Sequence, residues 1–98
     1  MKIILRKAAQ SDLKNMVRYG AQEFGERVAI RYYRELTNRL KLLEANPMMG
    51  SPFKELRSKD YRKLMSGNHV ILYKIADDSI VVERIMDARQ NWQALRFD

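Results

Sequence analysis

Three candidate strands in the second half of the chain are separated by two short segments with the composition of hairpin turns, and this spacing constrains the fold more than any other feature. The candidate strands span residues 61–65, 69–75 and 80–86, and the separators read Ser-Gly-Asn and Ala-Asp-Asp-Ser. Glycine, asparagine and aspartate readily adopt the backbone conformations of hairpin turns. Since connections this short join antiparallel neighbours, the three segments are predicted to form an antiparallel meander.

The first half of the chain carries two helical patterns. Apolar residues recur at steps of three and four over residues 9–24 and again over residues 29–43, which is typical of helices with one buried face. Gly25 is placed to end the first helix, because glycine adopts the left-handed conformation found at many helix ends. Pro47 closes the second, since the residue before a proline is disfavoured in helical conformation. The two helices are predicted to form an antiparallel hairpin.

The remaining segments are shorter. Residues 3–5 read Ile-Ile-Leu between charged residues, which predicts a first strand buried on both faces. Ser11 and Asp12 are candidate N-caps of the helix that follows, although its apolar period is also compatible with a start before them. Residues 46–60 hold both prolines and are predicted to be an irregular loop, and the mixed tail of residues 89–98 is compatible with a short helix.

Together these segments predict an α+β fold with the order β-α-α-β-β-β, in which the helical hairpin packs on one face of a small, mainly antiparallel sheet. The chain has 98 residues, which suits one packed core, so residues 1–98 are expected to form a single domain. Arg62 and Arg84 lie on strands from which they can reach the opposite face. The sequence does not fix which alternate residues of each strand face outward.

The charge balance indicates an anionic partner. The chain carries 19 Lys and Arg against 12 Asp and Glu, a formal net charge of +7. A field of this size attracts nucleic acid, a nucleoprotein, an acidic protein segment or an anionic membrane surface, and net charge does not separate these partners. The same charge can also serve solubility alone.

Cysteine usage and motifs restrict the chemistry. The chain has no cysteine, which excludes disulfides and Cys-ligated metal sites and favours the reducing cytoplasm. The first apolar run is interrupted by charge too early for a signal peptide, and no stretch approaches the roughly 18 apolar residues of a membrane span. The sequence shows no nucleotide-binding loop and no paired metal-binding carboxylates. We therefore expect neither a cofactor nor a metal.

His69 is the chain's single histidine. It opens the most apolar strand, and Tyr73 follows four positions later, so both side chains project from the same face. One interpretation makes His69 a general acid or base near neutral pH. The other makes it a structural histidine at a strand entry. A single histidine without cysteine does not suffice for a zinc site.

Arginines and a tryptophan supply further candidates. Guanidinium groups bind phosphate or carboxylate through two parallel hydrogen bonds, so a converging arginine cluster would suit RNA, DNA or an acidic peptide, whereas scattered surface arginines are also common. Trp92 can stack on a base, anchor a partner helix or pin the tail to the core. Met48 lies in the irregular loop, where flexible methionines suit adaptable contacts. The four arginines of this half of the chain that we single out are Arg57, Arg62, Arg84 and Arg89.

The order and spacing of one set of residues match a known pattern. The set comprises Ala9, Asp12, Leu13, Tyr19, Gly25, Ala29, Tyr33, Leu40, Leu43, Pro47, Gly50, Arg57, Tyr61, Arg62, the run His69-Val70-Ile71-Leu72-Tyr73, Ile80, Arg84 and Ile85. With these residues the chain resembles the ParE toxins of the ParE/RelE superfamily. The resemblance covers about nine tenths of the chain, from the first strand to Arg89. Each motif tolerates other residues and is weakly specific alone, but the order and spacing of the motifs together are fairly specific.

The resemblance implies a RelE-like fold and a role as the toxin of a type II toxin–antitoxin system. ParE-like toxins are neutralised by an antitoxin, here expected to be ParD-like, whose acidic, initially disordered tail folds on the toxin. They are described as poisoning DNA gyrase, so that replication stalls. On this basis the target-binding candidates are Arg57, Arg62, His69, Tyr73, Arg84, Arg89 and Trp92. The antitoxin-binding candidates, on the apolar margin of the hairpin and the following loop, are Met16, Tyr19, Tyr32, Leu36, Leu40 and Met48.

The sister RelE branch implies a different activity on the same fold, cleavage of messenger RNA on the ribosome by basic residues and a carboxyl-terminal tyrosine or histidine. This chain departs from that pattern, because Val70 stands where an arginine would be expected and no tyrosine or histidine follows Tyr73. The sequence therefore favours a gyrase inhibitor without catalytic chemistry of its own. The alternatives are a RelE-like endoribonuclease and a non-toxic binding module of the same fold.

Overall fold

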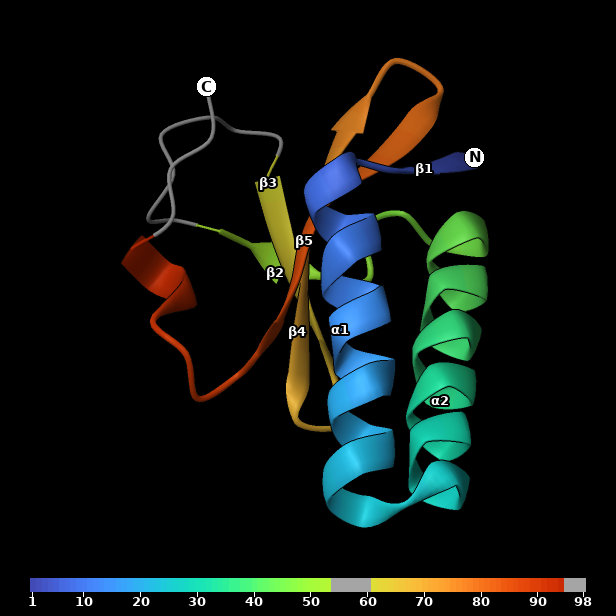
Figure 1. The fold of residues 1–98 in the computed structure, drawn as a ribbon. Helices are drawn as coiled ribbons and strands as arrows, with labels where there is room; N and C mark the ends of the chain where they lie inside the picture. The colour runs from blue at the N-terminus through green and yellow to red at the C-terminus, as the bar shows by residue number, and fades with distance from the viewer. Residues whose placement is uncertain (54–60, 95–98) are drawn as a thin grey trace.

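A computed structural model describes residues 1–53 and 61–94 of the chain (Figure 1). The predicted order of strand, two helices and three strands is confirmed, and a short additional strand and a terminal 3-10 turn join it. The elements are β1 (Lys2–Leu5), α1 (Lys7–Phe24), α2 (Glu26–Ala45), β2 (Ser51–Pro52), β3 (Tyr61–Ser66), β4 (His69–Ala76), β5 (Ser79–Asp87) and η1 (Trp92–Ala94).

The strands form one sheet in the order β1-β5-β4-β3-β2. The predicted meander is confirmed, because β3, β4 and β5 pair antiparallel in sequence order. β1 pairs parallel with β5, so the sheet is mixed and mainly antiparallel. Part of the predicted irregular loop is instead the two-residue strand β2, in which Ser51 pairs with Lys63 and Pro52 with Arg62. A proline is tolerated there because β2 is an edge strand.

Both helices pack on the same face of the sheet, side by side and antiparallel (Figure 1). Gly25 separates them with a φ of 94°, which confirms its predicted role. α1 begins at Lys7, so Ser11 and Asp12 lie inside the helix and the predicted N-cap is wrong. Arg6 takes the N-cap position without a side-chain capping bond.

The first strand is half-buried and not, as predicted, buried on both faces. Ile3 and Leu5 pack against the core, but Ile4 is 41% exposed. The physical reason is the position of β1 at the sheet edge with the helices on one face only. A β-branched run in a small sheet therefore does not by itself indicate a central strand.

The sheet buries apolar side chains on both of its faces. On the helix side, residues of α1 and α2 pack against Leu64, Ile71 and other strand residues. On the opposite side a smaller cluster forms, in which the ring of Trp92 meets the ring of Phe53 edge to face with centroids 5.7 Å apart. The end of the described chain thus covers the sheet face that the helices leave open. The second cluster contains Phe53, Tyr61, Val70, Leu72 and Trp92, with Met86 packed against it.

Candidate functional site

The half of β5 that follows Val82 extends beyond β1, whose last residue Leu5 pairs with Val82. The β4–β5 register shifts in the same region, because Leu72 pairs with Arg84 whereas Tyr73 pairs with Val82. Glu83 is the additional residue at this irregularity. Bulges of this kind turn side chains in new directions and are common at sheet edges and beside functional sites.

Two ion pairs join the start of α1 to this irregular part of β5. In one the arginine is on the helix side, and in the other the arginine is on β5. Arg6, just before α1, donates to the buried carboxylate of Glu83 at 2.8 Å. Asp12 of α1 accepts two hydrogen bonds from Arg84, at 2.7 Å from Nε and 2.9 Å from Nη2, and a third from the Ile85 backbone N–H at 2.9 Å. The hydrogen bonds from Arg84 to Asp12 raise the pKa of the guanidinium. Asp12 therefore joins the helix to the sheet instead of capping the helix.

A groove of about 550 Å³ lies between α1 and the free end of β5, and we refer to it as the β5 groove. Five of the candidates predicted from sequence line it, although they come from both the target-binding and the antitoxin-binding sets. The structure therefore brings together residues that are far apart in the chain. The lining residues are Asp12, Asn15, Met16, Tyr19, His69, Arg84, Ile85, Asp87, Arg89 and Gln90.

The second arginine of the β5 groove is also paired. Arg89 is largely exposed, and its Nη2 and Nε lie 2.7 Å and 2.9 Å from the two carboxylate oxygens of Asp87. The hydrogen bonds from the Arg89 side chain lower the pKa of Asp87 to about 2, and the same contact raises the pKa of Arg89. Both groove arginines thus face a carboxylate of the same chain, and the pair of Arg84 is the better shielded from solvent, because the Arg84 side chain is 29% exposed and that of Arg89 is 80% exposed.

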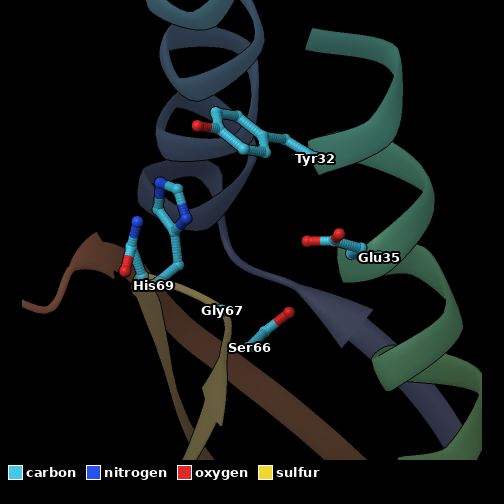
Figure 2. A pocket seen from close by; sticks show the side chains of 6 residues that line it. Tyr32, Glu35, Ser66, Gly67 and His69 are labelled. Carbon is cyan, nitrogen blue, oxygen red and sulfur yellow. The ribbon is translucent and has the colours of Figure 1, made fainter. Parts of the chain in front are cut away.

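His69 lies at the border between the β5 groove and a smaller pocket of about 100 Å³ under α2. Figure 2 shows Tyr32 and Glu35 of α2 facing the turn that joins β3 to β4 and His69, the first residue of β4. The rings of Tyr32 and His69 meet edge to face with centroids 6.0 Å apart. Burial lowers the pKa of His69, Asp87 and Glu35 act in the opposite direction, and Arg89 adds to the lowering. The neutral imidazole is therefore favoured at neutral pH.

Tyr73, a predicted target contact, is instead a structural residue. It is completely buried, its hydroxyl donates to the Pro47 carbonyl at 2.7 Å, and it accepts from the Gly50 N–H at 3.0 Å. Burial raises the pKa of this hydroxyl. Gly50 is required here, because a Cβ at this position would approach the Tyr73 hydroxyl to 2.6 Å. Tyr73 fixes the loop after α2 and cannot touch a partner in this conformation.

Two further candidates lie elsewhere. Arg62 donates to the carbonyl of Gly50 and so helps to hold the loop between α2 and β2. Trp92 is nearly buried, and its indole N–H donates to the Ala88 carbonyl at 3.2 Å, so it pins the chain end to the sheet. The cation that approaches the Trp92 ring is Lys63, 5.2 Å from the centroid. Arg57 lies outside the described residues.

The predicted antitoxin contacts differ in accessibility. Tyr19 is 54% and Met48 63% exposed, so both are available to a partner. Tyr32 and Leu40 are half-buried, and Met16 is largely buried at the bottom of the β5 groove. Leu36 is only 1% exposed and belongs to the core, so its assignment as a contact is wrong. The helical period places an apolar residue on the buried side of a helix but does not tell the centre of that side from its margin.

The carboxylates of this region were not predicted. Each of three carboxylates pairs with an arginine. The partners of Asp12 and Glu83 are far away in the chain, whereas the partner of Asp87 lies only two residues on. Of the three ion pairs, only that of Asp87 and Arg89 could be anticipated from the sequence, because two residues separated by one position beyond a strand can contact each other.

Among the described residues, no three His, Cys, Asp or Glu side chains are grouped so as to hold a metal ion. In the same part of the chain, neither helix has the length and apolar character that a membrane crossing requires.

Comparison with solved structures places this arrangement among RelE-like toxin folds. A structure described as the chromosomal ParDE TA system from P. aeruginosa superposes with a TM-score of 0.75, 16% identity, and coverage of 89% of this chain and 95% of the other. The YoeB dimer from Staphylococcus aureus superposes with a TM-score of 0.59 and 19% identity, over 88% and 94% of the two chains. At this level of identity the likeness shows the fold.

Sequence comparison is more specific. Residues 3–92 match the family described as ParE toxin of type II toxin–antitoxin system, parDE. Toxin ParE1 of Caulobacter vibrioides is 35% identical over 71 residues, which cover 72% of this chain and 73% of the relative. Toxin ParE1 of Mycobacterium tuberculosis is 30% identical over 89 residues, which cover 90% of each chain. The chain belongs to the ParE toxin family of type II toxin–antitoxin systems.

Proposed function

We propose that the chain is a cytoplasmic toxin that inhibits DNA gyrase by binding and is neutralised by an acidic, ParD-like antitoxin. One observation favours a binding role over a ribonuclease role: the polar side chains expected to do the chemistry already have hydrogen-bond partners within the chain. Arg84 and Arg89 each make two hydrogen bonds to a carboxylate of the same chain, and the Tyr73 hydroxyl is buried with a partner on either side. RNA cleavage needs a general base and cations that are free to stabilise a phosphate transition state.

The one titratable side chain suited to acid–base work near neutral pH is His69, and its surroundings do not support catalysis. Its ring packs against Tyr32, and burial favours its neutral form. A neutral imidazole can accept a proton, but a cleavage reaction also needs an acid for the leaving group. Among the described residues that line the β5 groove, the remaining acid–base side chains are Tyr19, which is 54% exposed on α1, and the carboxylates of Asp12 and Asp87, which are already paired with arginine.

The helical hairpin offers a surface for the antitoxin. An outer groove of about 330 Å³ between the helices is lined mainly by apolar atoms of Leu13, Val17 and Tyr33, with Lys14 beside them. An amphipathic segment with apolar anchors and acidic flanks matches this combination, and the net charge of +7 favours its approach. The accessible predicted contacts Tyr19 and Met48 are proposed to extend this interface.

The test is a pair of purified-component assays. Under the proposal, the protein inhibits supercoiling by gyrase or makes gyrase accumulate cleaved DNA, and messenger RNA on translating ribosomes stays intact. Addition of the cognate antitoxin restores supercoiling. Cleaved messenger RNA together with unaffected gyrase would establish the RelE-like endoribonuclease instead. No effect in either assay and no growth arrest on expression would indicate a non-toxic binding module.

A further inference from the structure

The outward face of α2 carries a row of arginines that no function described above uses. Arg27, Arg31 and Arg34 are all exposed, and they line a shallow hollow of about 500 Å³ together with Ile30, Glu35 and Asn38. Three guanidinium groups and one carboxylate therefore share this surface. We refer to these three residues as the α2 arginine row.

The α2 arginine row lies on the side of the helix opposite the core. Ala29, Leu36 and Leu43 are the buried residues of α2. With 3.6 residues per turn, positions 27, 31 and 34 project about half a turn away from these three. At a rise of about 1.5 Å per residue, the three arginines span roughly 10 Å along a rigid helix. Their spacing is therefore fixed before any ligand binds.

The arginines of the row also lack the internal partners that the β5 groove provides. The ion pairs formed among residues 1–53 and 61–94 are Arg6–Glu83, Arg84–Asp12 and Arg89–Asp87. Arg27, Arg31 and Arg34 take part in none of them. A guanidinium group has five N–H donors and binds phosphate oxygens bidentately, so three such groups in a row, without an ion pair to any carboxylate that the structure describes, form a surface for a repeating anion.

We infer that the α2 arginine row binds the phosphate backbone of double-stranded DNA, without reading the base sequence. One strand of a duplex presents a phosphate about every 3.4 Å along the helix axis, so a row of roughly 10 Å can meet about three of them. None of the described residues that line the hollow is aromatic, whereas single-stranded nucleic acid is usually held by bases that stack on aromatic rings. An acidic peptide that folds on binding needs several apolar anchors, and the groove at Leu13, Val17 and Tyr33 offers them, whereas Ile30 is the one apolar side chain among the described residues that line the hollow at the arginine row.

The experiment measures the affinity of the full chain for a fluorescent DNA duplex of random sequence by anisotropy at several salt concentrations. With three phosphate contacts, the logarithm of the binding constant falls with the logarithm of salt with a slope of about −2.7, which is about a 40-fold loss between about 50 and 200 mM salt. The triple variant Arg27→Gln, Arg31→Gln, Arg34→Gln flattens the slope to near zero. The single variant Arg31→Gln reduces it by about 1.

A matched control removes the same number of positive charges from α1. Lys7, Lys14 and Arg18 are likewise exposed, and their joint replacement by glutamine leaves most of the slope in place if the row is the binding site. Glutamine is a good helix former, and circular dichroism melts check that both triple variants fold. Equal flattening by both triple variants, no binding at the lowest salt, or tight binding of poly-glutamate but not of duplex would each overturn the inference. It does not depend on gyrase as the target, because purified DNA is the only ligand in the assay.

Discussion

The β5 groove and the α2 arginine row contain the same kind of side chain in opposite states. In the groove, Arg84 and Arg89 bind Asp12 and Asp87 through two hydrogen bonds each. On α2, the three arginines form no ion pair with any described carboxylate. The position of an arginine in the chain therefore says little about its task, because the neighbouring carboxylates decide whether it holds the fold or is available to a partner.

The largest expected effect comes from removing the groove's central carboxylate. Asp12→Ala leaves Arg84 without its two hydrogen bonds and the Ile85 N–H without its acceptor, in a site where both side chains are less than a third exposed. We expect the free energy of unfolding to fall by about 2–4 kcal/mol in urea denaturation. Glu23→Ala removes an exposed carboxylate from the same helix and should cost less than about 0.5 kcal/mol. Similar losses in the two variants would show that the Asp12 contacts do not hold α1 to β5.

The next effect concerns the coupling between the two partners. Arg84→Ala and the double variant Asp12→Ala, Arg84→Ala complete a double-mutant cycle with the wild type. We expect a coupling energy of about 1–3 kcal/mol, because each single variant leaves a partly buried charge that the double variant removes. A coupling energy near zero would mean that Asp12 and Arg84 contact solvent instead of each other in the folded protein. The arginines of the β5 groove and of α2 would then not differ in their pairing.

A smaller effect is expected from pH. The pKa of His69 lies below its ordinary value of 6.5, mainly because of burial. At a pH between the pKa of His69 in the folded protein and its ordinary value, the unfolded chain binds more protons than the folded one. The contribution of neutral His69 to stability is therefore complete above about pH 6.5 and is lost as the pH decreases below that value. His69→Gln should flatten this part of the stability curve, measured by urea denaturation at several pH values. Asp87, with a pKa of about 2, stays charged over this range and does not obscure the result. A wild-type curve that is flat near pH 6 would contradict the burial of the imidazole.

The smallest effect on stability is expected on α2. Arg31→Gln removes an exposed guanidinium that contributes no ion pair among the described residues. The free energy of unfolding should change by less than about 0.5 kcal/mol. A loss comparable to that of Arg84→Ala would show that Arg31 holds the fold, and the row could then not be regarded as free for a partner.

Local patterns in the sequence were sufficient to predict most of the fold. The tight turns, the helical periods and Gly25 each act over a few residues, and the structure confirms the elements they predict. The exposure of Ile4 and the burial of Leu36 were not predictable in the same way. Both depend on which neighbour covers which side of an element, and periodicity alone does not contain that information.

The site was predicted only in part, for the same physical reason. His69, Arg84 and Arg89 do converge on one groove. Their charge state could not be predicted, because Asp12 lies 72 residues from Arg84 and is brought to it by the packing of α1 on β5. Tyr73 was expected to face a partner, but its pairing with the loop at Pro47 and Gly50 is likewise a tertiary contact. Strand geometry predicted that His69 and Tyr73 project from the same face of β4, but it did not predict which residues surround them.

One side-by-side measurement tests the division between structural and available arginines most directly. Arg84→Gln and Arg31→Gln each remove one positive charge, and for both variants the free energy of unfolding and the salt dependence of duplex DNA binding would be determined. We expect a crossed pattern, in which Arg84→Gln loses stability with little change in the salt slope and Arg31→Gln lowers the slope by about 1 with little change in stability. If the two variants behave alike in both measurements, the distinction between the β5 groove and the α2 arginine row is wrong.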